Sequence, residues 1–314
     1  MDGTDDGSGA GWRGAAFTQT PAEVVIREPG ERRLSPPQLL ASEAERDWEY
    51  AWLSVAAYNG TPAGRKRLAA RRPPPSADGE YRSPEEILAA RGWVRWQGFP
   101  DAALARQIDA AHLRAEVWER ARDAVVAVTF GGTVIDNEKD WRSNLRWFLP
   151  WDKDEYTTVV NSFAPAFAAE LTRRVRESAG AEPRPRRLFA TGHSLGGGLA
   201  QQFAYALPDV PAGARVERVY AFDPSPVTGY FSVPAAIRRR NVHGLLIDRI
   251  YERGEILALL RSLTGFVFPP SAADPAVRGV RYSLFYPADP IAAHSMPELA
   301  RRLSLAIGHR EILA

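Results

Sequence analysis

One strand-to-helix junction constrains the fold of this chain more than any other stretch. Residues 188–207 read LFATGHSLGGGLAQQFAYAL, which is an apolar run, a turn containing Gly192 and Gly196, and then a run rich in Ala, Gly and Leu. A turn this sharp leaves no room for side chains at its flanking positions, so glycine is required there by sterics. The junction predicts a buried strand that passes directly into a helix, with Ser194 raised between them.

The rest of the chain alternates between strand-like and helix-like patterns. Strands are expected within residues 112–130 (two, around a charged turn), 186–192, 214–223, 243–254 and 280–287, and helices within 42–58, 161–180, 194–207 and 295–308. Residues 124–130 are nearly all apolar, which is typical of a central strand buried on both faces. This order predicts an α/β fold with a mostly parallel central sheet flanked by helices.

The chain is interpreted as one large domain with an N-terminal extension. Residues 1–40 show little apolar periodicity and are expected to be flexible or loosely docked. Residues 41–314 form the domain, and its first helix is expected to start at Ser42, which has Glu45 three residues later as in a capping box. The segment 61–85 is basic and rich in Pro, and it is interpreted as an exposed loop.

Composition excludes several classes of function. A net charge of +2 argues against a dedicated nucleic-acid-binding protein, and the absence of Cys excludes disulfides, thiolate metal sites and Cys nucleophiles. The N-terminus lacks the basic and apolar regions of a signal peptide, and no apolar run has the roughly 18–20 residues that span a bilayer. We therefore expect a cytoplasmic protein, and leaderless secretion stays open.

Ser194 lies in a G-x-S-x-G pattern at a position where a serine acts as a nucleophile. The turn directs the backbone N–H of Leu195 and the start of the next helix toward an anion forming above the serine. Such a serine needs a histidine base, which follows it in chain order in this type of fold. His294 is favoured, because His243 comes too early and His309 lies near the end of the last predicted helix.

The carboxylate that orients the histidine has four candidates. Glu255 follows a predicted strand directly and is favoured, because working residues in open α/β sheets lie at the carboxyl ends of strands. Asp223 is the runner-up, after the preceding predicted strand. Asp248 lies inside a strand, so its carboxylate is expected to point across the sheet toward an Arg, and Asp289 comes after a further strand. This chemistry requires no metal and no cofactor.

Several motifs together resemble the class 3 (fungal-type) lipase family of α/β-hydrolases. VVAVTFGGTVIDNEKDW, residues 125–141, looks like that family's strand and oxyanion loop, and VYAFDPSPVTGYF, residues 219–231, looks like its segment after the next strand. The resemblance implies an α/β-hydrolase fold and a carboxylic ester hydrolase with Thr133 and Leu195 at the oxyanion. It again selects Glu255 as the acid and implies lipid or small ester substrates.

Three departures place the chain in a divergent, bacterial-looking branch of that superfamily. Gly131 stands where the family usually has an Arg that supports the oxyanion loop. Glu255 replaces the usual Asp, and the residues after Asp223 lack the usual Arg.

The aromatic residues at the end of the oxyanion motif and just after it have two interpretations. Trp141, Trp147, Phe148 and Trp151 suit a lid or acyl-chain surface, and they equally suit ordinary packing on the core. With the basic residues 65–72 they also suit transient contact with a membrane surface. Two alternatives remain: a secreted phospholipase-type effector toxin, and a non-catalytic binding protein with the same fold. The sequence leaves the head group, acyl length and oligomeric state undecided.

Overall fold

The computed structural model describes residues 22–29, 31–34, 36–58, 82–132, 154–177, 186–210, 213–255, 271–284 and 292–309. The strands within them are β1 (Glu23–Glu28), β2 (Glu31–Leu34), β3 (Val94–Arg95), β4 (Ala115–Arg120), β5 (Val125–Phe130), β6 (Arg187–His193), β7 (Val216–Phe222), β8 (Leu246–Glu252) and β9 (Ala276–Ser283). The α-helices are α1 (Pro37–Tyr58), α3 (Pro84–Ala90), α4 (Ala102–Ala110), α6 (Asp154–Thr158), α7 (Ala164–Glu177), α8 (Leu195–Ala206), α9 (Ala235–Val242) and α11 (Met296–Ala306).

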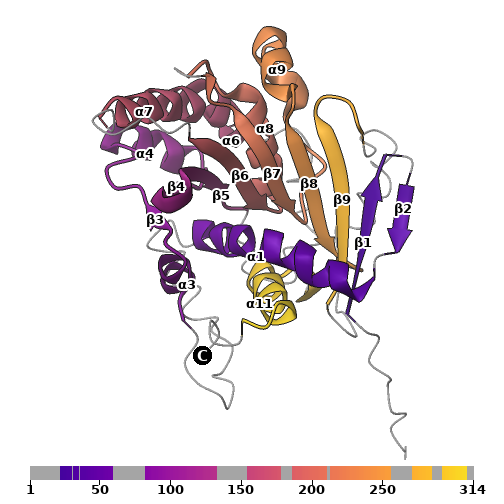
Figure 1. Ribbon diagram of the computed structural model, residues 1–314. Helices are drawn as coiled ribbons and strands as arrows, with labels where there is room; N and C mark the ends of the chain where they lie inside the picture. The colour runs from indigo at the N-terminus through magenta and orange to yellow at the C-terminus, as the bar shows by residue number, and fades with distance from the viewer. Residues whose placement is uncertain are drawn as a thin grey trace, which may run out of the picture.

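The strands form one twisted sheet in the order β2-β1-β9-β8-β7-β6-β5-β4-β3 (Figure 1). Strands β5 to β9 are parallel, and the remaining pairs at both edges are antiparallel. Helices α7 and α8 cover one face of the sheet, and α1 and α11 cover the other. The predicted α/β fold with a mostly parallel central sheet is therefore confirmed.

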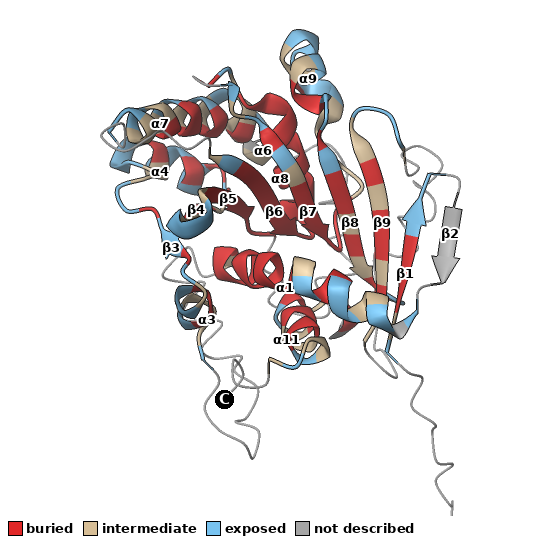
Figure 2. Cartoon of the chain, in the orientation of Figure 1, coloured by how far each residue is buried: buried red, intermediate tan, exposed pale blue. Residues whose placement is uncertain are grey.

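The core has two layers, because each central strand contributes to both faces. In β5 every residue is buried: Val126, Val128 and Phe130 join the layer under α7 and α8, whereas Val125 and Ala127 join the layer under α1. Figure 2 shows the buried residues gathered on the central strands and on the helix surfaces that face them. This explains the unbroken apolar run in the sequence of β5.

The N-terminal residues differ from the extension expected for 1–40. Strand β1 pairs antiparallel with β9, with Val25 opposite Arg281, and Val24, Val25 and Ile26 are buried. Helix α1 begins at Pro37 rather than Ser42, because proline is accepted in the first helical turn, where its missing N–H has no partner to lose. The Ser42 hydroxyl donates instead to the Leu39 carbonyl at 3.1 Å.

Several other boundaries also differ from the sequence-based prediction. The prediction also omitted β3, α4, α6 and α9, and it placed β9 four residues too late. It assigned residues 84–85 to the Pro-rich loop, but they begin α3, where Ser83 and Glu86 form a capping box. The rest of that loop, 61–81, lies outside the described residues. Among the described residues, no helix is long and apolar enough to cross a membrane.

The junction between β6 and α8 packs tightly under the end of β5. A methyl group on Gly196 would overlap the carbonyl oxygen of Phe130, and one on Gly192 would overlap the carbonyl oxygen of Gly196. Both neighbours are backbone atoms and cannot rotate aside. The two glycines are therefore required by contact between the strand, the turn and the helix.

Replacing Gly196 with Ala is expected to lower the free energy of unfolding by about 2–3 kcal/mol, because overpacking here outweighs the better helix propensity of Ala. Chemical denaturation with a linear fit measures this change. Gly279→Ala is the matched control: the nearest atom to an added methyl is 3.5 Å away, and a change within about 0.5 kcal/mol is expected. If the two variants had equal free energies of unfolding, the predicted overlap of a residue-196 methyl group with the Phe130 carbonyl would be wrong.

Candidate active site

Ser194 occupies a strained position at the junction between β6 and α8. It has φ 57° and ψ −123°, a backbone conformation that non-glycine residues rarely adopt. Three hydrogen bonds hold it there. Its N–H donates to the Phe222 carbonyl at 2.9 Å, and its own carbonyl accepts from the N–H groups of Ser225 at 2.9 Å and Gly197 at 3.0 Å. The turn is thus tied both to β7 and to the first turn of α8.

Glu255 and His294 form a buried pair, although 39 positions separate them in the chain. Glu255 lies just beyond β8, and His294 ends a short 3-10 helix that precedes α11. The carboxylate oxygen Oε2 of Glu255 and Nδ1 of His294 are 2.9 Å apart. Because both side chains are buried, this contact orients the imidazole more firmly than an exposed pair would.

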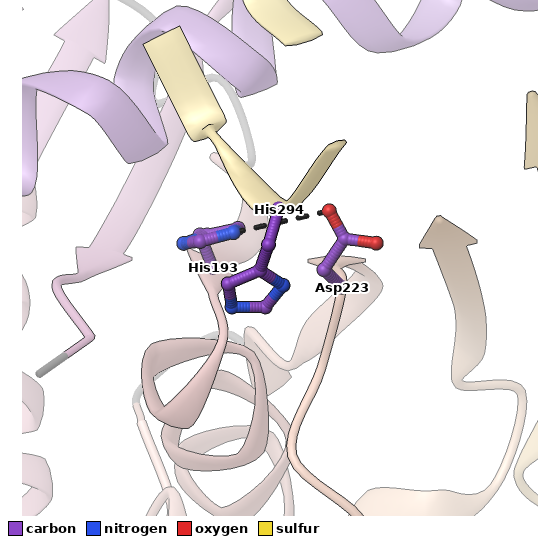
Figure 3. Close-up of side chains that lie close together, drawn as sticks. All are labelled: His193, Asp223 and His294. Carbon is purple, nitrogen blue, oxygen red and sulfur yellow. Dashed lines mark ion pairs between the residues drawn. The ribbon is translucent and has the colours of Figure 1, made fainter. Parts of the chain in front are cut away.

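A second histidine lies against His294. The rings of His193 and His294 have their centres 4.6 Å apart, and Asp223 comes from the end of the neighbouring strand (Figure 3). Nε2 of His193 lies 3.9 Å from Oδ2 of Asp223. Because His193 directly precedes Ser194, the contact between the two histidine rings places His294, which follows β9 in the chain, near the strand-to-helix turn. In the sequence, His193 is simply the residue between Gly192 and Ser194, and no local pattern indicates its contact with His294.

Tyr58 at the end of α1 contacts the other edge of His193. The Tyr58 hydroxyl and Nδ1 of His193 are 2.5 Å apart. Burial raises the pKa of the Tyr58 phenol above its usual range, against the opposing effect of the Arg114 charge, so the hydroxyl keeps its proton at neutral pH. A methyl group on Gly132 would stand 2.7 Å from this hydroxyl and 3.2 Å from Cβ of Ser194. The end of β5 therefore lies next to Ser194.

Arg114 supports the segment where Gly131 departs from the class 3 lipase pattern. Its Nη1 donates to the Gly132 carbonyl at 3.3 Å. A methyl group on Gly131 would stand 3.1 Å from Cβ of Arg114 and 3.0 Å from the Ala57 carbonyl, so little room is left for a larger side chain. An arginine that precedes β4 thus reaches the end of β5 from outside the motif. Its position before a neighbouring strand was the only sequence signal for it.

The other acid candidates have different surroundings. Asp248 accepts from Arg278 at 2.9 Å and from Arg218 at 3.2 Å, so the prediction that it points across the sheet toward an Arg is confirmed. Asp223 is fully buried at φ 39°, and its Oδ1 accepts the Glu252 N–H at 3.2 Å. It is therefore Glu255 that contacts Nδ1 of His294.

The two remaining histidine candidates lie elsewhere. Nδ1 of His243 is 2.7 Å from Oδ2 of Asp274 in an exposed pair, and the His309 ring lies 4.9 Å from the Trp48 ring. Leu195 is the first residue of α8, directly after Ser194. The remaining predicted site residues lie outside the described residues: Thr133, Trp141, Trp147, Phe148, Trp151 and Asp289.

No protein-family model and no curated protein sequence matches this chain. Among solved structures, it is similar to the lipase of Rhizomucor miehei in complex with its propeptide, at 15% identity over 76% of this chain and 67% of the other, with a TM-score of 0.41. It is similar to lipase II of Rhizopus niveus at 15% identity over 76% of this chain and 79% of the other, with a TM-score of 0.36.

A third similar structure is esterase B of Lactobacillus rhamnosis with a tributyrin phosphonate inhibitor. The identity is 13% over 88% of this chain and 98% of the other, with a TM-score of 0.35. These three likenesses are at the level of the fold.

Arg114→Met keeps most of the side-chain stem but removes the donor to the Gly132 carbonyl. We expect a loss of about 1–2 kcal/mol in the free energy of unfolding and faster amide hydrogen exchange at Gly131 and Gly132. Arg95→Met is the control, because Arg95 bonds Glu116 near the exposed edge of the sheet. Unchanged exchange at both glycines in Arg114→Met would show that this arginine does not support the segment.

Proposed function

We propose that this protein is a serine hydrolase that cleaves carboxylic esters of lipids through an acyl-enzyme. The observation that carries the proposal is the buried contact between Glu255 and Nδ1 of His294, whose ring lies against His193, the residue that precedes the strained Ser194. An imidazole whose Nδ1 is held by a carboxylate presents Nε2 as a base, and this is the arrangement that activates a serine hydroxyl.

Acylation uses each of these groups in turn. Nε2 of His294 removes the proton from Oγ of Ser194 as the oxygen attacks the ester carbonyl. The backbone N–H of Leu195 and Thr133 bind the resulting oxyanion, and each such donor lowers the barrier by about 3–4 kcal/mol. Glu255 stabilises the imidazolium, which then gives its proton to the leaving alcohol.

Deacylation repeats the sequence with water as the nucleophile. His294 removes a proton from water, the hydroxide attacks the acyl group, and the proton returns to Ser194 as the fatty acid leaves. The strained backbone at Ser194 supports this cycle, because it raises the side chain above the sheet beside the N-terminus of α8.

Lipid esters are proposed as the substrates on the strength of the aromatic residues at the end of the oxyanion motif and just after it. Trp141, Trp147, Phe148 and Trp151 would form an apolar surface for the acyl chain and would contact a membrane surface transiently. The shape of this surface then sets the preference for acyl-chain length, because each methylene group changes the binding free energy of the transition state by about 1–3 kcal/mol.

Ser194→Ala is expected to lower the turnover of a p-nitrophenyl ester by at least about 10³-fold, because the nucleophile is lost. A fluorophosphonate probe should label the wild-type protein once and this variant not at all. Ser304→Ala is the control: it removes a buried hydroxyl that accepts from Nε1 of Trp52 at 2.9 Å in the helix after His294. Near wild-type turnover in Ser194→Ala, or a wild-type protein that the probe does not label, would reject the proposal.

Glu255→Gln is expected to lower kcat by about 10²–10⁴-fold, because the amide no longer stabilises the charged imidazole or selects its tautomer. Asp223→Asn should lower kcat much less, because the Asp223 carboxylate bonds the Glu252 N–H rather than Nδ1 of His294. Kinetics on both variants, with circular dichroism to confirm folding, measure the difference. A larger loss in Asp223→Asn would transfer the orienting role to Asp223.

A further inference from the structure

Three potential metal ligands converge beside the strand-to-helix turn. One ligand atom from each of His193, Asp223 and His294 can be chosen so that all three lie within 4.8 Å of one another, and all three residues are buried (Figure 3). They come from the end of β6, the end of β7 and the turn before α11, so the fold brings them together from three separate segments. Two imidazoles and one carboxylate form a familiar donor set for a zinc ion.

The orientation of both rings favours such a site. Nε2 of His193 points toward Asp223, while its Nδ1 contacts the Tyr58 hydroxyl. Nδ1 of His294 contacts Glu255, so Nε2 would be the donor atom that His294 offers a cation. A metal-bound histidine generally has its other ring nitrogen held by a carboxylate or another polar oxygen, which fixes the ring in place. Glu255 and Tyr58 hold the two rings in this way.

The distances and charges also suit a small divalent cation. Tetrahedral zinc with bonds of about 2.0–2.1 Å needs ligand atoms about 3.4 Å apart. Nε2 of His193 and Oδ2 of Asp223 are 3.9 Å apart, and the three ligand atoms lie within 4.8 Å of one another, so side-chain shifts of about 0.5–1.5 Å close the site around an ion. Two carboxyl groups, Asp223 and Glu255, lie at the site, and in their ionised forms they would balance the two positive charges of a buried Zn²⁺. Two nitrogens and a carboxylate oxygen disfavour Ca²⁺ and Mg²⁺, which prefer oxygen ligands.

We propose that His193, Asp223 and His294 form a Zn²⁺-binding site, and that bound Zn²⁺ inhibits the esterase reversibly. Zinc on Nε2 of His294 occupies the lone pair that would otherwise accept the serine proton. Binding and catalysis therefore exclude each other. The proposed inhibition depends on the proposed function, whereas the proposed Zn²⁺ binding depends only on the geometry of the three side chains.

Zinc binding is tested on the Ser194→Ala variant. This variant keeps all three proposed ligands, and the binding measurement does not depend on enzymatic activity. Titration with Zn²⁺ against a chromogenic chelator is expected to give one ion per chain. Adding His193→Gln or Asp223→Asn should weaken binding by at least about tenfold. His243→Gln is the matched control, because His243 and Asp274 form an exposed histidine–carboxylate pair elsewhere, and its affinity should equal that of the parent. Circular dichroism confirms that each variant is folded.

Three results would overturn the binding site: no Zn²⁺ bound, affinity unchanged in both ligand variants, or affinity lost in His243→Gln instead. Inhibition is measured separately on the wild-type protein. Zn²⁺ should abolish its hydrolysis of a p-nitrophenyl ester, and EDTA should restore that activity. Ester hydrolysis that persists at saturating Zn²⁺ would overturn inhibition. A protein that binds one Zn²⁺ at these residues but hydrolyses no ester would retain the site and reject the proposed function.

Discussion

The contact between the first turn of α8 and the end of β5 is the constraint on which the site depends. Because Gly196 has no side chain, the helix starts directly against the Phe130 carbonyl, and Ser194 is held at a positive φ above the sheet. The same closeness brings Gly132 beside Ser194 and leaves room for Tyr58 to reach His193. A helix that began even slightly farther from β5 would separate these groups.

Buried carboxylates near the sheet are distinguished by their partners. Asp248 contacts Arg218 and Arg278, Asp223 contacts the Glu252 N–H and lies near His193, and Glu255 contacts His294. A buried charge is stable only where opposite charge or hydrogen-bond donors meet it, so these partners decide what each group can do. Glu255 contacts the imidazole and can orient it, whereas Asp248 lies between two guanidinium groups and stabilises the fold.

Much of the fold could be predicted because its central strands and helices carry strong local signals. The continuous apolar run of β5 and the glycine-flanked turn before α8 each have one physical explanation, and both interpretations are confirmed. Strand β1 was missed because it is short, lies in a segment poor in apolar periodicity, and is stabilised by pairing with β9 from the far end of the chain. Such pairing leaves no local pattern, so residues 22–34 read as part of an extension.

The sequence by itself determined the strand–turn–helix at Ser194 and the order in which a serine, a carboxylate and a histidine follow one another. The strand–turn–helix depends on steric limits among neighbouring residues, and the order of the three residue types is read directly along the chain. Only the tertiary structure decided that Glu255 rather than Asp223 contacts Nδ1 of His294, that Arg114 reaches the place left by Gly131, and that His193 lies against His294. Each of these contacts joins segments far apart in the chain, and their distances follow from how the sheet and helices pack.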